Sequence, residues 1–225
     1  QFKHCKKRLL FGCDTRESSY KIINLISLGL NSEGCSISNA GIISTPAIAF
    51  YTKKNKYDLG IVVSASHNLY KDNGIKIFDK DGYKITFEDE NHIENYIEKL
   101  VNENYQCKKS SYNLIDVSED IQKEYAEFCL KNINLNKSAN NNIKLTLDLA
   151  NGANFKVGKD IFNKAGFLVN CYNNKPNGKN INDRCGSTYL KNLPDQIKKD
   201  CSEYGISMDG DGDRLGVVDE LGNFI

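Results

Sequence analysis

Three aspartates stand at alternate positions in the segment Asp209-Gly210-Asp211-Gly212-Asp213-Arg214. Carboxylates this close repel one another unless a hard divalent cation lies between them, and the intervening glycines let the backbone curl. Mg²⁺ is the natural ligand, so we expect Asp209, Asp211 and Asp213 to form a metal site. Arg214 suggests an anion nearby, because a guanidinium beside metal-binding carboxylates can hold a phosphate oxygen.

Two other interpretations of this acidic segment stay open. One is an ordinary acidic surface turn. The other is a calcium loop of the EF-hand type, in which Glu220 would take the twelfth position. That loop requires glycine at its sixth position, where this chain has Arg214, and helices on both sides, where this chain predicts strands. A non-catalytic Ca²⁺- or phosphate-binding module is therefore the alternative from another functional class.

A second cluster, Ser64-Ala65-Ser66-His67-Asn68, follows a nearly continuous apolar run. A serine that leaves a buried strand beside one of the chain's three histidines is a candidate nucleophile or phosphate carrier. A plain serine turn is the alternative. Lys76 begins the next predicted strand, and a desolvated lysine in the same cleft could move a proton or hold a phosphate.

A third cluster, Gly12-Cys13-Asp14-Thr15-Arg16, precedes a predicted helix that begins near Ser18 and Ser19. Helix N-termini attract anions and Arg16 adds positive charge, so a phosphate site and a simple helix cap both account for it. The chain has neither a Walker-type glycine-lysine loop nor a dinucleotide glycine fingerprint. Aspartates, a serine and basic residues together indicate phosphoryl transfer through a phosphoserine.

The elements that must position these clusters alternate between strands and helices. Apolar runs predict strands at residues 8–13, 35–38, 58–65, 74–78, 143–150, 167–172 and 205–209. A helical period predicts helices at residues 19–30, 47–53, 155–164 and 193–204. Capping signals at Thr86 and Ser118 begin two more helices. This alternation predicts α/β architecture with mainly parallel sheets, in which ligands gather at the loops after the strand C-termini.

The stretch between Asn132 and Asn142 is rich in Asn, Lys and Ser and predicts a linker. We therefore expect two tandem domains, residues 1–136 with the serine loop and residues 137–225 with the acidic loop. Each would be a three-layer α/β/α domain with a mixed, mainly parallel sheet.

Composition excludes several classes of protein. The 225 residues carry 30 basic and 29 acidic side chains, so a formal charge of +1 argues against a cationic nucleic-acid binder or a polybasic membrane binder. No apolar run approaches the roughly 20 residues that a membrane span needs. The eight cysteines have neither zinc-site spacing nor the context of a short secreted chain, which favours reduced thiols in a cytosolic protein.

The serine cluster, the segment Asp72-Asn73-Gly74-Ile75-Lys76 and the acidic segment, in this order, resemble the motifs of the alpha-D-phosphohexomutases. The closest likeness is to the bacterial phosphoglucosamine mutase branch. It depends on residues 148–153, 176–182 and 185–188. Sibling mutases acting on glucose or mannose phosphates are the alternative.

The resemblance implies that Ser66 is phosphorylated and that one Mg²⁺ is bound by Asp209, Asp211, Asp213 and a phosphate oxygen on Ser66. It also implies general acid/base roles for Lys76 and His67, and contacts from Arg16 and Arg214 to the phosphoserine. The implied reaction interconverts glucosamine 6-phosphate and glucosamine 1-phosphate through a bisphosphate. That reaction feeds UDP-N-acetylglucosamine and cell-wall precursor synthesis in the cytoplasm, and the resemblance is compatible with a homodimer.

This chain departs from the family pattern at a few places. Leu69 stands where proline is usual, Ser19 where glycine is usual, and Ser44 where proline is common. The family has four domains, of which we expect this chain to carry most of the first and second, truncated at both ends. Because the sugar-reading third domain and the phosphate-binding fourth are absent, we expect this piece alone to have little or no mutase activity.

Overall fold

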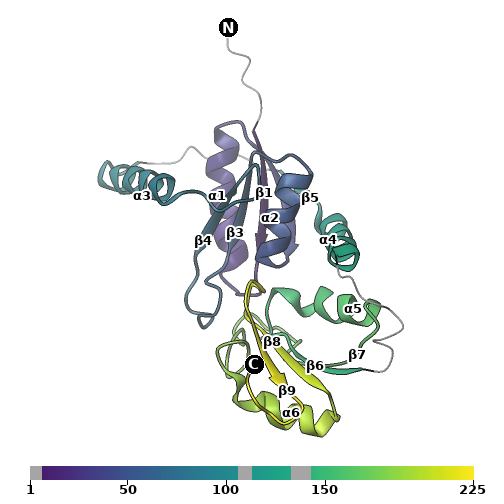
Figure 1. Ribbon diagram of the computed structural model, residues 1–225. Helices are drawn as coiled ribbons and strands as arrows, with labels where there is room; N and C mark the ends of the chain where they lie inside the picture. Colours follow the sequence, from purple (N-terminus) through teal and green to yellow (C-terminus); the bar gives the residue numbers. More distant parts are fainter. Residues whose placement is uncertain (1–6, 106–112, 133–142) are drawn as a thin grey trace.

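The computed structural model describes residues 7–105, 113–132 and 143–225. Figure 1 shows two α/β lobes joined end to end, with the N-terminal lobe above the C-terminal lobe. The N-terminal lobe contains β1 (Arg8–Cys13), α1 (Ser19–Ser32), β2 (Ser36–Ile42), α2 (Thr45–Lys54), β3 (Leu59–Val63), β4 (Ile75–Asp79), α3 (Phe87–Asn102), β5 (Leu114–Asp116) and α4 (Ser118–Asn132). The C-terminal lobe contains β6 (Lys144–Asp148), α5 (Val157–Lys164), β7 (Leu168–Tyr172), α6 (Leu193–Asp200), β8 (Tyr204–Met208) and β9 (Leu215–Asp219).

The N-terminal sheet has the strand order β4-β3-β1-β2-β5. All neighbouring strands are parallel except β3 and β4, which run antiparallel. The centre of the sheet is buried on both faces, as the nearly continuous apolar sequence of β3 predicts. The mixed, mainly parallel sheet confirms the expected fold class.

Helices cover both faces of this sheet. Leu10 and Val62 pack with Ile48 of α2 and Ile121 of α4 on one face. On the other face, the alternate residues of β1 pack against Ile23 of α1. Because successive side chains of a strand point to opposite faces, β1 serves both cores.

The C-terminal sheet repeats this plan with the order β7-β6-β8-β9, parallel except for the β8–β9 pair. Leu193 and Ile197 of α6 pack against Val218 of β9. Figure 1 shows α5 and α6 on opposite sides of this sheet. The carboxyl ends of β3 and β8, which lead into the serine and acidic clusters, face each other where the lobes meet.

The sequence placed the central elements correctly but erred at several ends. The strand expected at residues 35–38 extends to Ile42, and β5 was not expected at all. The helix expected to reach Tyr204 ends at Asp200, because Cys201 adopts a left-handed conformation (φ 51°) that terminates it. The domain boundary expected at residues 136 and 137 falls outside the described residues and stays a prediction.

Helix α3 begins as its capping signal predicts, with Thr86 accepting a hydrogen bond from the Asp89 backbone N–H. Its apolar face, however, is not covered by other parts of the described chain. None of its residues is buried, and the exposed apolar side chains are Phe87, Ile93, Tyr96, Ile97 and Val101. Figure 1 shows this helix extending sideways from the N-terminal lobe.

Candidate active site

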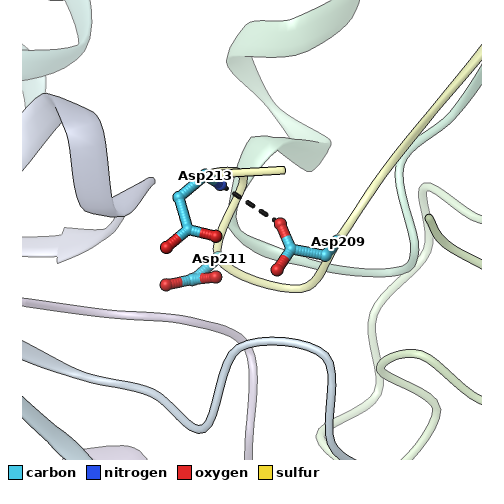
Figure 2. Close-up of side chains that lie close together, drawn as sticks. All are labelled: Asp209, Asp211 and Asp213. Atoms are coloured by element: carbon cyan, nitrogen blue, oxygen red, sulfur yellow. Dashed lines mark hydrogen bonds between the residues drawn. The ribbon is translucent and has the colours of Figure 1, made fainter. Parts of the chain in front are cut away.

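The acidic segment forms the loop between β8 and β9. One carboxylate oxygen from each of Asp209, Asp211 and Asp213 lies within 4.8 Å of the others. Figure 2 shows the three side chains close together on this one loop. Asp209 Oδ1 shapes it by accepting hydrogen bonds from the backbone N–H groups of Asp213 and Arg214, each 3.1 Å long. Strands flank the loop, so it lacks the two helices of an EF-hand.

Ser66 meets this loop from the other lobe. Its Oγ donates a hydrogen bond of 2.6 Å to Asp209 Oδ2, although the two residues are 143 positions apart in the chain. Arg214 Nη2 donates to the same Oγ, and Ser66 is buried. The structure therefore brings the serine hydroxyl, a carboxylate and a guanidinium into direct contact.

The Ser66 backbone is held in an uncommon conformation. Its φ of 51° lies in the left-handed region, which costs a residue other than glycine about 1–2 kcal/mol. The Ser66 backbone N–H donates to Ser64 Oγ, and Ser64 Oγ donates to Asp14 Oδ2. These contacts at the end of β3 hold the loop in place.

Arg16 lies behind the serine loop and is almost fully buried. Its guanidinium pairs with Asp14 and donates from Nη2 to the carbonyl oxygens of Ser66 and Asn68. Burial raises the pKa of Asp14, and the adjacent Arg16 opposes that rise. These contacts are to protein atoms, so Arg16 supports the loop that carries Ser66. Its predicted contact with a phosphate stays a prediction.

Lys76 reaches the acidic loop from the first residues of β4. Its Nζ lies 2.6 Å from Asp211 Oδ2 and 2.9 Å from Asp213 Oδ2. Burial acts to lower the pKa of Lys76, but the hydrogen bonds to the two aspartates outweigh it and the pKa is raised. Lys76 is therefore charged and donates hydrogen bonds to two aspartates at the junction of the two lobes.

His67 lies at the rim of the same site. Its Nδ1 is 2.6 Å from Arg214 Nη2, and Arg214 Nε lies 3.4 Å from Asp209 Oδ2. Arg214 therefore links the serine, the histidine and the acidic loop. The side chains of His67 and Arg214 are both exposed to solvent.

The two buried aspartates of the loop differ electrostatically. Burial is the main factor that raises the pKa of Asp209, and the neighbouring carboxylates add to it. Burial acts the same way on Asp211, but hydrogen bonds from Lys76 and Thr45 outweigh it and lower its pKa. Asp211 is therefore the more firmly ionised of the two.

Sequence reasoning did not assign a role to Thr45. Its Oγ1 donates to Asp211 Oδ2 at 2.5 Å, and its backbone N–H donates to the Asp211 carbonyl at 2.9 Å. Both contacts come from the first turn of α2, where proline follows Thr45. The sequence signal at this position indicates only a helix start, since the partner lies in the other lobe.

The residues present fit a magnesium ion. Asp211 Oδ1 is buried and has no hydrogen-bond partner among the described residues, so it is an unused acceptor in this loop. The donor set of Asp209, Asp211, Asp213 and Ser66 consists only of oxygen atoms, which Mg²⁺ prefers.

Comparison with known proteins identifies both lobes. Residues 1–104 match the phosphoglucomutase/phosphomannomutase alpha/beta/alpha domain I, and residues 123–222 match domain II of the same family. A phosphoglucosamine mutase of Thermodesulfovibrio yellowstonii is 40% identical over 225 residues, covering 98% of this chain and 49% of that protein. The chain thus spans about half the length of such relatives.

Solved structures agree with this assignment. A phosphoglucomutase/phosphomannomutase family protein of Burkholderia thailandensis has a TM-score of 0.79 and 25% identity, covering 97% of this chain and 48% of that one. An N-acetylphosphoglucosamine mutase of Aspergillus fumigatus in complex with GlcNAc-6P and magnesium has a TM-score of 0.50 and 19% identity, covering 80% of this chain and 47% of that one. The chain belongs to the phosphoglucomutase/phosphomannomutase family, of which it carries domains I and II.

Proposed function

We propose that the protein containing this chain is a phosphoglucosamine mutase, which interconverts glucosamine 6-phosphate and glucosamine 1-phosphate. The observation that carries the proposal is the contact between Ser66 Oγ and Asp209 Oδ2, which joins a hydroxyl to three clustered carboxylates. The name of the 40% identical relative supports the amino sugar as substrate. Glucose and mannose phosphates are the alternative substrates, because the matched family model carries those names.

Ser66 would carry the phosphoryl group between the two ends of the sugar phosphate. Its Oγ accepts from Arg214, so this guanidinium is placed to neutralise phosphate oxygens on the serine. Mg²⁺ held by the three aspartates would offset the charge that spreads over the transferred group. A complex of the Aspergillus fumigatus relative with magnesium and a sugar phosphate supports both ligands.

Lys76 is the candidate general acid/base. Its ammonium lies against Asp211 and Asp213. When the phosphoryl group passes from Ser66 Oγ to a sugar hydroxyl, the hydroxyl loses a proton and the serine oxygen gains one, and Lys76 would take part in this proton transfer. His67 is the second candidate, since its ring contacts Arg214 at the edge of the site. The two-domain piece lacks about half of its relatives' length, so the full-length protein is the material for assay.

Replacing Ser66 and Asp211 in the full-length protein tests the proposal. We expect Ser66→Ala to abolish mutase activity, because the phosphoryl carrier is gone, and Asp211→Ala to lower kcat about 10²–10³-fold and raise the Mg²⁺ requirement. Asp81→Ala, which changes an exposed aspartate in the turn after β4, is the matched control and should retain full activity. An Asp211→Ala enzyme with an unchanged rate and unchanged Mg²⁺ dependence would contradict the metal assignment.

Substrate class is tested separately. The full-length protein is assayed side by side on glucosamine, glucose and mannose phosphates, and we expect the highest kcat/KM on the glucosamine phosphates. A preference for mannose or glucose phosphate would indicate a phosphomannomutase or a phosphoglucomutase instead. The proposed roles of Ser66 and the aspartates would be unchanged. The homodimer and the cytoplasmic location stay predictions. No helix in the described residues is long and apolar enough to cross a membrane.

A further inference from the structure

Asn182 crosses from the C-terminal lobe to the serine loop of the N-terminal lobe. Its Nδ2 donates to the Ser66 carbonyl oxygen at 2.8 Å and to the Asn68 carbonyl oxygen at 3.0 Å. The side chain is nearly fully buried, with 6% of the residue exposed. Neither the acidic loop nor the serine motif includes this residue.

The same two carbonyl oxygens also accept hydrogen bonds from Arg16. Arg16 Nη2 lies 3.3 Å from the Ser66 oxygen and 2.6 Å from the Asn68 oxygen. One donor from each lobe therefore binds the same two carbonyl oxygens of the serine loop. Removing either donor leaves both carbonyl groups with fewer hydrogen-bond partners, including the buried carbonyl of Ser66, and weakens the interactions that hold the loop in this conformation.

Ser66 needs such support because its backbone is left-handed, with φ 51°. A serine relaxes from that region unless the surroundings over-determine it. Rotation of the Ser66 backbone would swing Oγ away from Asp209. Holding the carbonyl on one side of the residue fixes the direction of the side chain on the other.

Asn182 is itself firmly held by its own lobe. Its backbone N–H donates to the Ala150 carbonyl at 2.9 Å, and the preceding Ile181 is fully buried. Its φ of 56° is left-handed, which asparagine tolerates better than most residues. Gly210 packs directly beneath, since a Cβ there would lie 2.7 Å from Asn182 Nδ2 and from the Ser66 oxygen. Asn182 thus links the acidic loop, its own lobe and the serine loop.

We propose that Asn182 is a positioning residue for phosphoryl transfer, which aims the Ser66 hydroxyl at the metal loop by holding the Ser66 and Asn68 carbonyl groups from the opposite lobe. It contacts protein atoms, so it acts through Ser66. This inference rests on the proposed role of Ser66 as phosphoryl carrier.

Two substitutions in the full-length protein separate donation from backbone shape. Asn182→Asp keeps the size and the tolerance for a left-handed backbone but turns the donor into a carboxylate that repels both carbonyl oxygens. Asn182→Gly keeps the backbone freedom and removes the donor without adding repulsion. We expect kcat to fall about 100-fold in Asn182→Asp and about 10-fold in Asn182→Gly, with KM for glucosamine 6-phosphate within about 3-fold of the parent value.

Asn192→Asp is the matched control. Asn192 Nδ2 donates to the Arg184 carbonyl, an exposed contact within the C-terminal lobe, and this variant should keep the parent kcat. Melting temperatures are recorded for every variant. If Asn182→Asp does not fold, Asn182→Gly decides: a kcat loss with unchanged KM supports the inference, and an unchanged kcat overturns it.

The order of the two variants is the decisive readout. A residue that only fills space would make Asn182→Gly the worse variant, which would overturn the inference. Mass spectrometry of the active parent protein keeps the two proposals distinguishable. An active parent without phosphate on Ser66 would refute the phosphoserine itself, whereas a phosphorylated parent whose Asn182 variants retain kcat would refute only the positioning role.

Discussion

The two lobes repeat one structural unit and place different chemistry in the same part of it. In each lobe a central strand, β1 or β6, runs parallel to both of its neighbours. One of these neighbours, β3 or β8, continues through a loop, and the chain returns as an antiparallel edge strand, β4 or β9. The loop of the N-terminal lobe, residues 64–74, carries the serine. The loop of the C-terminal lobe, residues 209–214, carries the aspartates.

The likeness extends to the turns that follow. After β4 the Asp79 backbone N–H donates to the Tyr83 carbonyl, and after β9 the Asp219 backbone N–H donates to the Asn223 carbonyl. Both aspartate side chains accept from backbone N–H groups two and four residues further on. Gly82 and Gly222 occupy equivalent left-handed positions.

This comparison teaches that the scaffold supplies position and the loop supplies chemistry. One lobe offers a hydroxyl and a lysine, and the other offers carboxylates and an arginine. Neither set alone could hold a metal ion against a phosphoserine. Substitutions of the site residues that either lobe contributes should therefore disable a site that both lobes share, whereas substitutions in the repeated turns should affect stability alone.

Apart from the loss of the phosphoryl carrier itself, the largest effect should come from Lys76, which belongs to the N-terminal unit but contacts the loop of the other. We expect Lys76→Met to lower kcat of the full-length protein about 10²–10⁴-fold, the range for a lost general acid/base. Mg²⁺ affinity, measured by calorimetric titration, should be unchanged or tighter, because a cation that competes for Asp211 is removed.

The exposed Lys71, in the same loop as Ser66, gives the control for Lys76. Lys71→Met should leave kcat unchanged. A Lys76→Met enzyme with the parent rate, or with Mg²⁺ affinity lost, would break the assignment of proton transfer to the N-terminal unit.

A smaller effect is expected for Thr45, which supports the acidic loop from the first turn of α2. Thr45→Val removes the hydroxyl that donates to Asp211. It should raise the Mg²⁺ concentration that gives half-maximal rate about 10–100-fold, as for other groups that orient metal ligands. Thr45→Ser retains the hydroxyl and should restore most of the loss. If both variants behave alike, the hydroxyl does not orient Asp211. The measurement is the Mg²⁺ concentration that gives half-maximal rate.

The smallest effect on catalysis should come from the paired turns. Gly82→Ala and Gly222→Ala each place a side chain at left-handed φ, at a cost of about 1–2 kcal/mol. At Gly82 the added Cβ would also lie 2.6 Å from the Ala49 carbonyl oxygen, whereas at Gly222 the nearest atom is Pro194 Cβ at 3.1 Å. Gly82→Ala should therefore lower the melting temperature more.

Both turn variants should keep the parent kcat below their unfolding transitions. Calorimetry measures the shift in melting temperature. Equal shifts would show that the Ala49 carbonyl yields to the new methyl group, and a larger shift for Gly222→Ala would contradict the expected ranking.

Much of the fold was predictable because the spacing of apolar residues along the sequence indicates helices and strands. The buried strands β1 and β3 have nearly continuous apolar sequences, and Thr86 and Pro46 indicate helix starts. The short edge strand β5 lacked such a signal, because it has only three residues. Leu114 is partly buried, whereas Ile115 is exposed.

The site was predictable to a different degree. Asp209, Asp211 and Asp213 stand at alternate positions in one short segment, so their charge pattern predicts a metal site. Thr45 and Asn182 act on partners in the opposite lobe, and their roles are defined by contacts that no local pattern contains. The same limit applies to Arg16, whose fully buried position behind the loop could not be read from its neighbours.

The hydrogen bonds between Thr45 and Asp211 and between Asn182 and Ser66 have a consequence for exchanging parts among relatives. Each joins a side chain of one lobe to the working loop of the other. A chimera that takes its first domain from one mutase and its second from another would combine two folded domains whose contacts across the interface do not match. We expect such a chimera to be active only when the donor and the acceptor of each hydrogen bond across that interface come from the same parent.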